Sequence, residues 1–439
     1  MGRQVLTHMG LAVPAAMRQL EVVINWPRVV VDTIEERQDV KSILVPQDEG
    51  AADTLRRLYD ANDLESELSS WKRDRLIYGR GFLSVGANEE DPSTPILQVE
   101  SPTQMCVKID RRHRRVAYAV RLLKSEEIEE PDIATLYTPD YTVIARNRGG
   151  IWTEEDRDDH KLGVVPVFPS FNRRMTGEYV GQTEMADVIP LTDAALRTMT
   201  NLQVAVEALA VPKRWIFGIK QGDFASLDGW FNYLQPFLAH ANANAKAGQF
   251  AAADLKNFHS TLESYGKLCA SVTGFPARYF GMTTANPPAE GAIIAEEAKL
   301  IKRVERVNAE AGIALSAALR FAAKLAGKDI PAGFVNIKWH DPATPTYAQK
   351  ADAVQKLSGG KPLLSREGAW DELGWDDSRK DQEREYFRAE AEDPALDSMM
   401  EKLANDEDTG GDVADVPVDA ERADRANEGV SGPVGRRRR

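Results

Sequence analysis

The side chains best suited to chemistry lie in two short stretches that place a histidine beside carboxylates. EEDRDDH covers residues 154 to 160, and WHDP covers residues 339 to 342. Imidazole nitrogens and carboxylate oxygens are ligands of divalent metals, so each stretch is a candidate metal site. The alternative is a solvated polar loop, which we favour because the other histidines stand alone: His8, His113, His240 and His259. We therefore expect neither a metal nor a cofactor.

Motifs that mark common catalytic sites are missing from the sequence. It has no G-x-x-x-x-G-K-S/T loop for phosphates, no H-E-x-x-H, no G-x-S-x-G and no C-x-x-C. The two cysteines, Cys106 and Cys269, are far apart, which is typical of reduced thiols rather than of a disulfide framework or a metal site. A catalytic site assembled from distant residues stays open, but nothing in the sequence argues for an enzyme.

The charge of the chain limits its partners. Its 439 residues carry a formal net charge of -13. A protein that grips DNA is usually basic, because neutralising phosphates supplies much of its affinity. Nucleic acid is therefore either no partner of this protein, or a partner that it meets without holding. The sequence shows no apolar run long enough to span a membrane and no secretion signal, so we expect no membrane partner.

The first 172 residues predict helices followed by strands. Residues 26 to 80 read as helical, with Pro27 near a helix start and Gly79 at a helix end. Their apolar residues have helical spacing: Leu55, Leu58, Leu64, Leu68, Trp71, Leu76 and Ile77. From Gly81 to about Asn172 the period changes to two, and short β-rich runs alternate with turn residues. This pattern predicts an antiparallel meander.

The remaining sequence predicts mostly helices. Two of them cover residues 187 to 210 and 254 to 273, with a strand at PKRWIFGIK and a stretch rich in aromatic residues between them. A strand at FVNIKWHDPATPT and two short helices follow further on. Beyond about residue 390 the chain is acidic and poor in bulky apolar residues, which predicts a disordered tail. The fold class is therefore α+β.

One predicted helix is much longer than usual, running from about residue 289 to 326. An apolar stripe follows one of its faces: Ile294, Ile301, Val304, Ala311, Leu315, Ala318, Ala322 and Leu325. Four cations follow the opposite face: Lys299, Lys302, Arg303 and Arg306. These cations form either a solvated basic face or a contact with a neighbouring acidic subunit or with DNA.

The loop before this helix is uncharged between Arg278 and Glu290. Pro287 and Pro288 stiffen it, and Gly281 lets it bend. A packed linker between domains accounts for such a loop. So does a loop that must sit beside a moving polyanion, because lysines would hold the phosphates and carboxylates would repel them.

Several stretches, in this order, resemble the portal proteins of tailed bacteriophages, the Gp6-like portal family of long-tailed actinobacterial phages. They are NWPRVVVDTIEER, WKRDRLIYGRGFLSV, VPKRW, TGFPARYFGMTTANPPAEGAIIAEEAKLIKRVERV and YAQKADAVQKL with GAWDELGW. The resemblance covers about residues 20 to 390. The block of loop and long helix is its most specific part, while the β meander alone would be a weak signal.

The resemblance implies a portal fold: an α/β wing, a stem of two helices, a small α/β clip, a long spine helix and an α-helical crown. It divides the chain into an N-terminal arm at 1–25, the wing at 26–186, stem helices at 187–210 and 254–274, the clip at 211–253, a tunnel loop at 275–290, the long wing helix and strand at 291–344, the crown at 345–390 and the disordered acidic tail at 391–439.

The resemblance also implies a function without catalysis. Portal proteins form a homo-oligomeric ring, usually of twelve subunits, at one capsid vertex of the virion, and double-stranded DNA is packaged and ejected through it. The expected partners are the terminase large subunit, a head-tail adaptor, the major capsid protein and scaffold, with assembly in the host cytoplasm. An acidic lumen would repel phosphate and so let the duplex slide. The alternatives are a virion assembly or adaptor protein without a channel and, less favoured, a nucleic-acid enzyme.

Individual residues take roles from the same resemblance. The DNA-facing residues of the tunnel loop would be Met282, Thr283, Thr284, Ala285 and Asn286. The residues of the clip that dock partners would be Trp215, Trp230, Phe231 and Tyr233.

Overall fold

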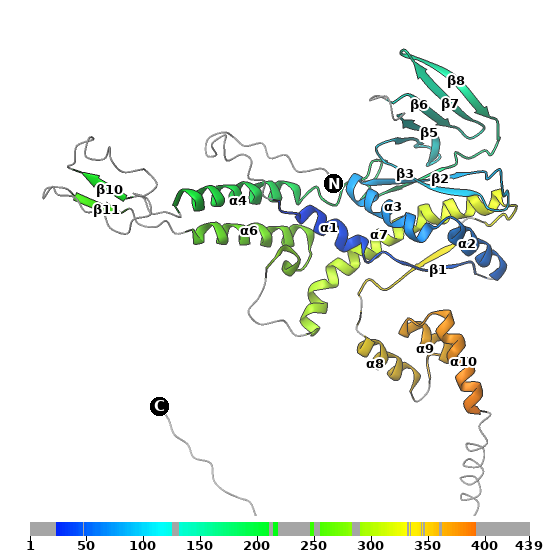
Figure 1. The fold of residues 1–439 in the computed structure, drawn as a ribbon. Helices are drawn as coiled ribbons and strands as arrows, with labels where there is room; N and C mark the ends of the chain where they lie inside the picture. Colours follow the sequence, from blue (N-terminus) through cyan, green and yellow to red (C-terminus); the bar gives the residue numbers. More distant parts are fainter. Residues whose placement is uncertain are drawn as a thin grey trace, which may run out of the picture. The chain divides into compact units, whose positions relative to one another are not determined.

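The computed structural model mixes helices with antiparallel strands, as the sequence predicts (Figure 1). It falls into two units that divide between residues 344 and 345, and each is described by itself. None of the described helices is both long and apolar enough to cross a membrane. The structure describes residues 23–46, 48–124, 131–209, 214–217, 246–249, 255–282, 290–331, 333, 335–343, 345, 347–359 and 362–391.

The described part of the first unit begins with three helices and a strand: α1 (Trp26–Glu35), β1 (Val40–Leu44), α2 (Glu49–Ala61) and α3 (Leu64–Tyr78). Pro27 lies in the first turn of α1, and the side chain of Asp48 caps α2 by accepting from the Ala51 amide at 2.8 Å. Asp63, with φ of 49°, takes the left-handed conformation between α2 and α3. The apolar stripe predicted from Leu55 to Ile77 is therefore carried by two helices. The strand β1 was not predicted.

Two antiparallel sheets follow. Three strands have the order β3-β2-β9: β2 (Arg80–Gly86), β3 (Ile96–Glu100) and β9 (Val167–Phe171). The other five form a meander in chain order: β4 (Met105–Asp110), β5 (Arg115–Leu123), β6 (Ile133–Tyr137), β7 (Thr142–Arg148) and β8 (Ile151–Asp158). Phe82, Met105, Ala119 and Val167 form a buried cluster with residues from both sheets. The predicted meander is thus confirmed for the five-stranded sheet only, because β9 returns to pair with β2.

Two long helices lie side by side in Figure 1: α4 (Ile189–Leu209) and α6 (Lys256–Thr273). Both were predicted. Between them the structure describes β10 (Arg214–Phe217) and β11 (Lys246–Gln249), which pair antiparallel. The strand predicted at PKRWIFGIK is confirmed as β10.

The long helix is α7 (Glu290–Leu325), and its 36 residues span about 54 Å at about 1.5 Å per residue. Its apolar stripe is buried at Val304, Ala311, Leu315, Ala318 and Ala322. Ile294, which belongs to the predicted stripe, is 50% exposed, so the first turns of α7 are not covered on that face. The predicted strand after the helix is β12 (Asn336–Trp339), which pairs with β1.

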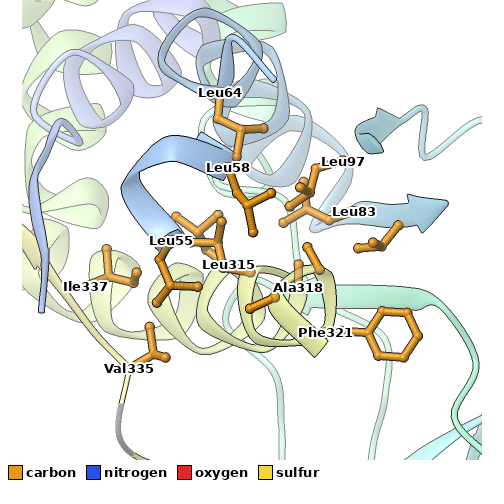
Figure 2. Packing of buried hydrophobic residues seen from close by; sticks show 14 of the residues in the cluster. Leu55, Leu58, Leu64, Leu83, Leu97, Leu315, Ala318, Phe321, Val335 and Ile337 are labelled. Atoms are coloured by element: carbon orange, nitrogen blue, oxygen red, sulfur yellow. The ribbon is translucent and has the colours of Figure 1, made fainter. Parts of the chain in front are cut away.

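The main core lies between α7 and the elements packed on it. Figure 2 shows Leu315 and Ala318 of α7 near Leu55 and Leu58 of α2. Leu83, from the adjacent sheet, joins the same cluster. Leu55, Leu58 and Leu315 are fully buried. Truncating any of these leucines to alanine is expected to cost about 2–5 kcal/mol, since each would leave a cavity.

The described part of the second unit contains three helices: α8 (Tyr347–Ser358), α9 (Arg366–Leu373) and α10 (Asp377–Ala391). Ser365 caps α9 by accepting from the Gly368 amide. Trp370 stacks on Trp375 and on Phe387, with ring centroids 5.8 and 6.0 Å away. The first two helices were predicted, whereas α10 was not. Residues 1–22, in the predicted N-terminal arm, and residues 392–439, in the predicted tail, lie outside the described residues.

Candidate functional site at the junction of α6 and α7

The segment that joins α6 to α7 begins as a packed turn. Gly274 ends α6 with φ of 73°, and Phe275 is buried directly after it. A 3-10 helix, η3 (Ala277–Phe280), follows, and Gly281 ends it with φ of 82°. Phe275 and Phe280 pack into a cluster with residues of α1 and α7. The first half of the predicted tunnel loop, up to Gly281, is therefore held in a core and is no free loop, because its phenylalanines are buried.

A buried carboxylate fastens this turn to α7. Glu297 ion-pairs with Arg278 and accepts a hydrogen bond from Tyr279 Oη at 2.9 Å. Arg37, just beyond α1, donates to Tyr279 Oη at 3.0 Å and lies 3.4 Å from Glu297. Arg278 also pairs with Glu296 at 3.1 Å. Two arginines thus compensate the charge of Glu297.

Arg303 fastens the end of α6 in the same way. Its guanidinium pairs with Glu184, whose side chain is fully buried, and donates to the carbonyl of Thr273 at 2.8 Å. It also lies 5.8 Å from the ring centroid of Phe275. The other oxygen of Glu184 accepts from the side-chain Nδ2 of Asn172 at 2.8 Å. Arg303 was expected to belong to an outward basic face, but its guanidinium forms an ion pair with a buried carboxylate of the same chain.

The other three cations of that face are exposed. Lys302 pairs with Glu305 one turn away at 2.5 Å. Lys299 lies close over Gly274, where an added Cβ would meet its side chain. Arg306 is exposed as well. Contact of these three with a neighbouring subunit or with DNA stays a prediction.

The remaining predicted site residues fall mostly outside the described chain. Met282 is described, and its sulfur lies near Gly266 of α6. Trp215 lies on β10. The others lie outside the described residues: Thr283, Thr284, Ala285, Asn286, Trp230, Phe231 and Tyr233.

Neither histidine stretch gathers metal ligands. Residues 151 to 159 form the exposed strand β8 and its end, where Arg157 pairs with Asp159 at 3.0 Å. His160 Nε2 lies 3.2 Å from the Thr142 hydroxyl. The amide of His340 donates to the carbonyl of Asp39 next to the β1–β12 pair. Across the residues that the structure describes, no three His, Cys, Asp or Glu side chains could hold a metal ion.

Sequence reasoning missed one central residue, Arg75 of α3. It is fully buried, and it donates to the carbonyl of Val307 at 2.9 Å and to the Ser170 hydroxyl at 3.3 Å. Burial lowers the pKa of its guanidinium to about 10, against the opposing effect of Glu310 and Glu184. A signal existed, since Arg75 continues the helical spacing of the buried Leu68 and Trp71. Arg75 thereby ties α3 to α7 beside the junction.

Comparisons with known proteins agree with the resemblance seen in the sequence. The family model described as "Phage portal protein, SPP1 Gp6-like" matches residues 14–395. The proteins named "Portal protein" of Mycobacterium phage D29 and Mycobacterium phage L5 are each 36% identical over 398 residues, or 87% of this chain and 82% of theirs. A chain of the virion of a native gene transfer agent particle matches with a TM-score of 0.45 at 15% identity, covering 80% of this chain and 89% of that one. The extent of the family match and the identity to these relatives show that the chain belongs to the SPP1 Gp6-like family of phage portal proteins.

Proposed function

We propose that this chain is a phage portal protein that forms a homo-oligomeric ring, expected to have twelve subunits, at one vertex of the capsid. Double-stranded DNA passes through the ring during packaging and ejection. The observation that carries the proposal is the 36% identity to two phage portal proteins over 87% of the chain. The role is mechanical, so the chain itself is proposed to have no catalytic activity.

The parts of the portal follow from the elements. Helices α4 and α6 are the proposed stem, and residues 211 to 253 between them are the proposed clip. The wing is assigned to residues 26–186 together with α7 and β12, and the crown to residues 345–390. The pairing of α4 with α6 and the antiparallel pair β10–β11 support this assignment.

The tunnel loop is proposed to be the part that faces DNA. Its uncharged residues 283 to 289 come directly before α7, and the ion pairs of Arg278 and Glu297 lie at its base. A neutral loop neither holds nor repels the phosphates that pass it. The net charge of -13 per subunit fits a channel that does not capture the duplex.

The partners in this role are a terminase large subunit during packaging and a head-tail adaptor afterwards, both docking at the clip. Trp215, Trp230, Phe231 and Tyr233 are the proposed docking residues. The major capsid protein and scaffold are further proposed partners, and the ring is proposed to assemble in the host cytoplasm before it occupies the portal vertex of the virion.

The purified full chain, imaged by negative-stain electron microscopy over a range of protein concentrations, tests the proposal. We expect rings with an axial hole wide enough for a DNA duplex. Rings or oligomers without such a hole would favour an adaptor or assembly protein. Particles that stay monomeric at every concentration, or turnover of nucleotide by the purified chain, would contradict the proposal.

A further inference from the structure

The turn between β4 and β5 carries concentrated positive charge. Residues 111 to 115, named here the basic turn, are four arginines around His113, and all five are exposed. Asp110 organises the turn by accepting from the Arg112 amide at 2.9 Å and from His113 at 2.5 Å. Within the described residues, none of the four arginines has an ion-pair partner. The turn therefore presents its guanidinium groups to whatever approaches it.

The edge strand β8 carries the opposite charge. Residues 154 to 159, named here the acidic strand, hold five carboxylates and one arginine, and all six are exposed. Glu155 pairs with Arg146 at 3.0 Å, and Asp159 pairs with Arg157. Glu154, Asp156 and Asp158 have no cation partner in the described part of the chain. Three carboxylates on one sheet edge are thus uncompensated.

These two charged segments cannot reach each other within one subunit. The strand order β4-β5-β6-β7-β8 puts them at opposite edges of one sheet. Figure 1 shows β5 to β8 in this succession, with β8 outermost. The register through Val107–Ala119, Ala119–Tyr137, Tyr137–Thr142 and Thr142–Asp158 sets the end of β8 level with Val107. The basic turn lies beyond that level in the same direction, at the end of the β4–β5 hairpin. Four strand spacings of about 4.8 Å separate the two edges by about 19 Å.

We propose that the basic turn of one subunit docks on the acidic strand of the next subunit around the ring. The inference rests on the proposed function, because subunits related by rotation present two different faces to their two neighbours. Opposite charges on opposite sides of one sheet suit such a head-to-tail contact. DNA as the partner of the arginines would leave the acidic strand unexplained.

Protection of the sheet edge is the competing explanation of the charges on β8, since charges on an exposed edge strand keep sheets from pairing with one another. Protection of the edge requires charged side chains on β8, but they can be either positive or negative. The two explanations therefore differ in what happens when the sign of both segments is reversed.

Charge reversal in the full-length chain tests the contact. One variant reverses the turn (Arg111→Glu, Arg112→Glu, Arg114→Glu and Arg115→Glu), and the other reverses the strand (Glu154→Lys, Asp156→Lys and Asp158→Lys). Glu155 and Arg157 stay, because they pair within the subunit. Ring formation is measured by sedimentation velocity. Each variant alone is expected to need about tenfold more protein, or more, to form rings, since several exposed pairs turn repulsive.

Recovery of ring formation when the reversed segments are combined shows whether the basic turn and the acidic strand contact each other. Both reversals in one chain are expected to return ring formation to the wild-type concentration. An equimolar mixture of the two single-segment variants is expected to form rings as well, because each turn then meets a strand of opposite sign. Neither result is expected if the arginines contact DNA or a capsid protein.

The control reverses two exposed carboxylates in the turn between β2 and β3, Glu89→Lys with Glu90→Lys, and is expected to leave ring formation unchanged. Differences between the variants should shrink at about 1 M salt, where the Debye length falls to about 3 Å. Wild-type-like rings from each single variant overturn the contact, and so does the failure of both the double reversal and the mixture to restore rings. Absence of rings from the wild type would instead reject the proposed function, and this contact with it.

Discussion

Arg303 acts at the scale of a single side chain to join the end of α6 to α7 through Glu184. Replacing it with alanine (Arg303→Ala) leaves the carboxylate of Glu184 buried without its cation, and we expect a loss of about 3–5 kcal/mol of unfolding free energy. Urea unfolding measures it, with Arg306→Ala, on the exposed part of the same helix, as the control expected to stay within about 0.5 kcal/mol. Equal stability of the two variants would refute the structural role of Arg303.

Glu100 gives the stability of the chain a dependence on pH. It is nearly fully buried between the Ser84 hydroxyl at 2.8 Å and Arg121 at 3.2 Å. Burial raises the pKa of its carboxyl above 4.5, although both neighbours oppose the rise. Because the pKa of Glu100 is higher in the folded state than in the unfolded state, its protonated form stabilises the fold, and this contribution is fully present below the unfolded-state pKa. That stability is lost as pH rises through the folded pKa.

The variant Glu100→Gln isolates this effect, because glutamine cannot titrate. We expect the stability of the wild type relative to Glu100→Gln to fall as pH rises from about 4.5 through the raised pKa and then to level off. Chemical unfolding of both proteins at a series of pH values measures the difference. A difference that does not change with pH, or that grows as pH rises, would contradict burial as the cause.

Sequence reasoning at this scale succeeded for apolar side chains and failed for charged ones. The spacing of Leu55, Leu58, Leu315 and Ala318 predicted burial, because a helix must cover its apolar stripe. Charge alone did not reveal that Arg303 points inward, since its partner Glu184 lies 119 residues away in the chain. A long-range pair of this kind leaves no local pattern.

At the scale of elements, the end of α3 depends on glycine more than most helix ends do. Gly79 has φ of 76°, and an added Cβ would lie 2.6 Å from the backbone carbonyl carbon of Gly181. Gly281 has a similar φ of 82°, but a Cβ there meets nothing within 4 Å. We expect Gly281→Ala to cost about 1–2 kcal/mol for its backbone conformation alone. Gly79→Ala should cost clearly more, because backbone atoms must also move. Thermal unfolding compares them, and equal costs would show that the close approach to Gly181 is unimportant.

The loop before α7 yields a prediction about DNA movement. A lysine at position 283 or 284 (Thr283→Lys or Thr284→Lys) places a cation where the sequence has none between Arg278 and Glu290. If the loop faces DNA, the lysine holds phosphates, and we expect fewer DNA-filled particles while rings still assemble. Packaged DNA per particle is the measurement, with Ser70→Lys on the exposed face of α3 as the control. Normal packaging by both lysine variants in the loop would refute its assignment.

Elements with strong local patterns were predictable, and elements defined by distant partners were not. The helices α4, α6 and α7 follow from long amphipathic runs. The strand β1 was missed because it exists through pairing with β12, almost 300 residues later. The charged sequence of β8 suggested a loop or a metal site, since an edge strand exposed on every residue shows no alternation. The turn η3 was missed because its aromatic residues pack into a cluster that includes the distant helices α1 and α7.

The whole chain is built from two units with separate cores. The described buried clusters that pack on α7 and between the sheets contain only residues before 345, whereas the second unit packs around Trp370 and its aromatic neighbours. We expect a chain that ends at residue 344 to keep the thermal midpoint of the first unit within about 2–4 °C. Calorimetry tests this, with a chain that ends at residue 391 as the control. Loss of the folded state after removal of the second unit alone would contradict the division.

The unbroken length of α7 has a mechanical consequence. One part of the helix supplies Leu300 and Val304 to the cluster around Phe275, and another part supplies Leu315 and Ala318 to the cluster with α2. No proline interrupts it, and its helical backbone runs continuously from one cluster to the other, with Gly312 between them. A displacement of its first part therefore acts on both clusters through one continuous helix. If the proposed tunnel loop meets DNA, α7 would connect that contact with the cluster around α2, about 20–40 Å away at about 1.5 Å per residue.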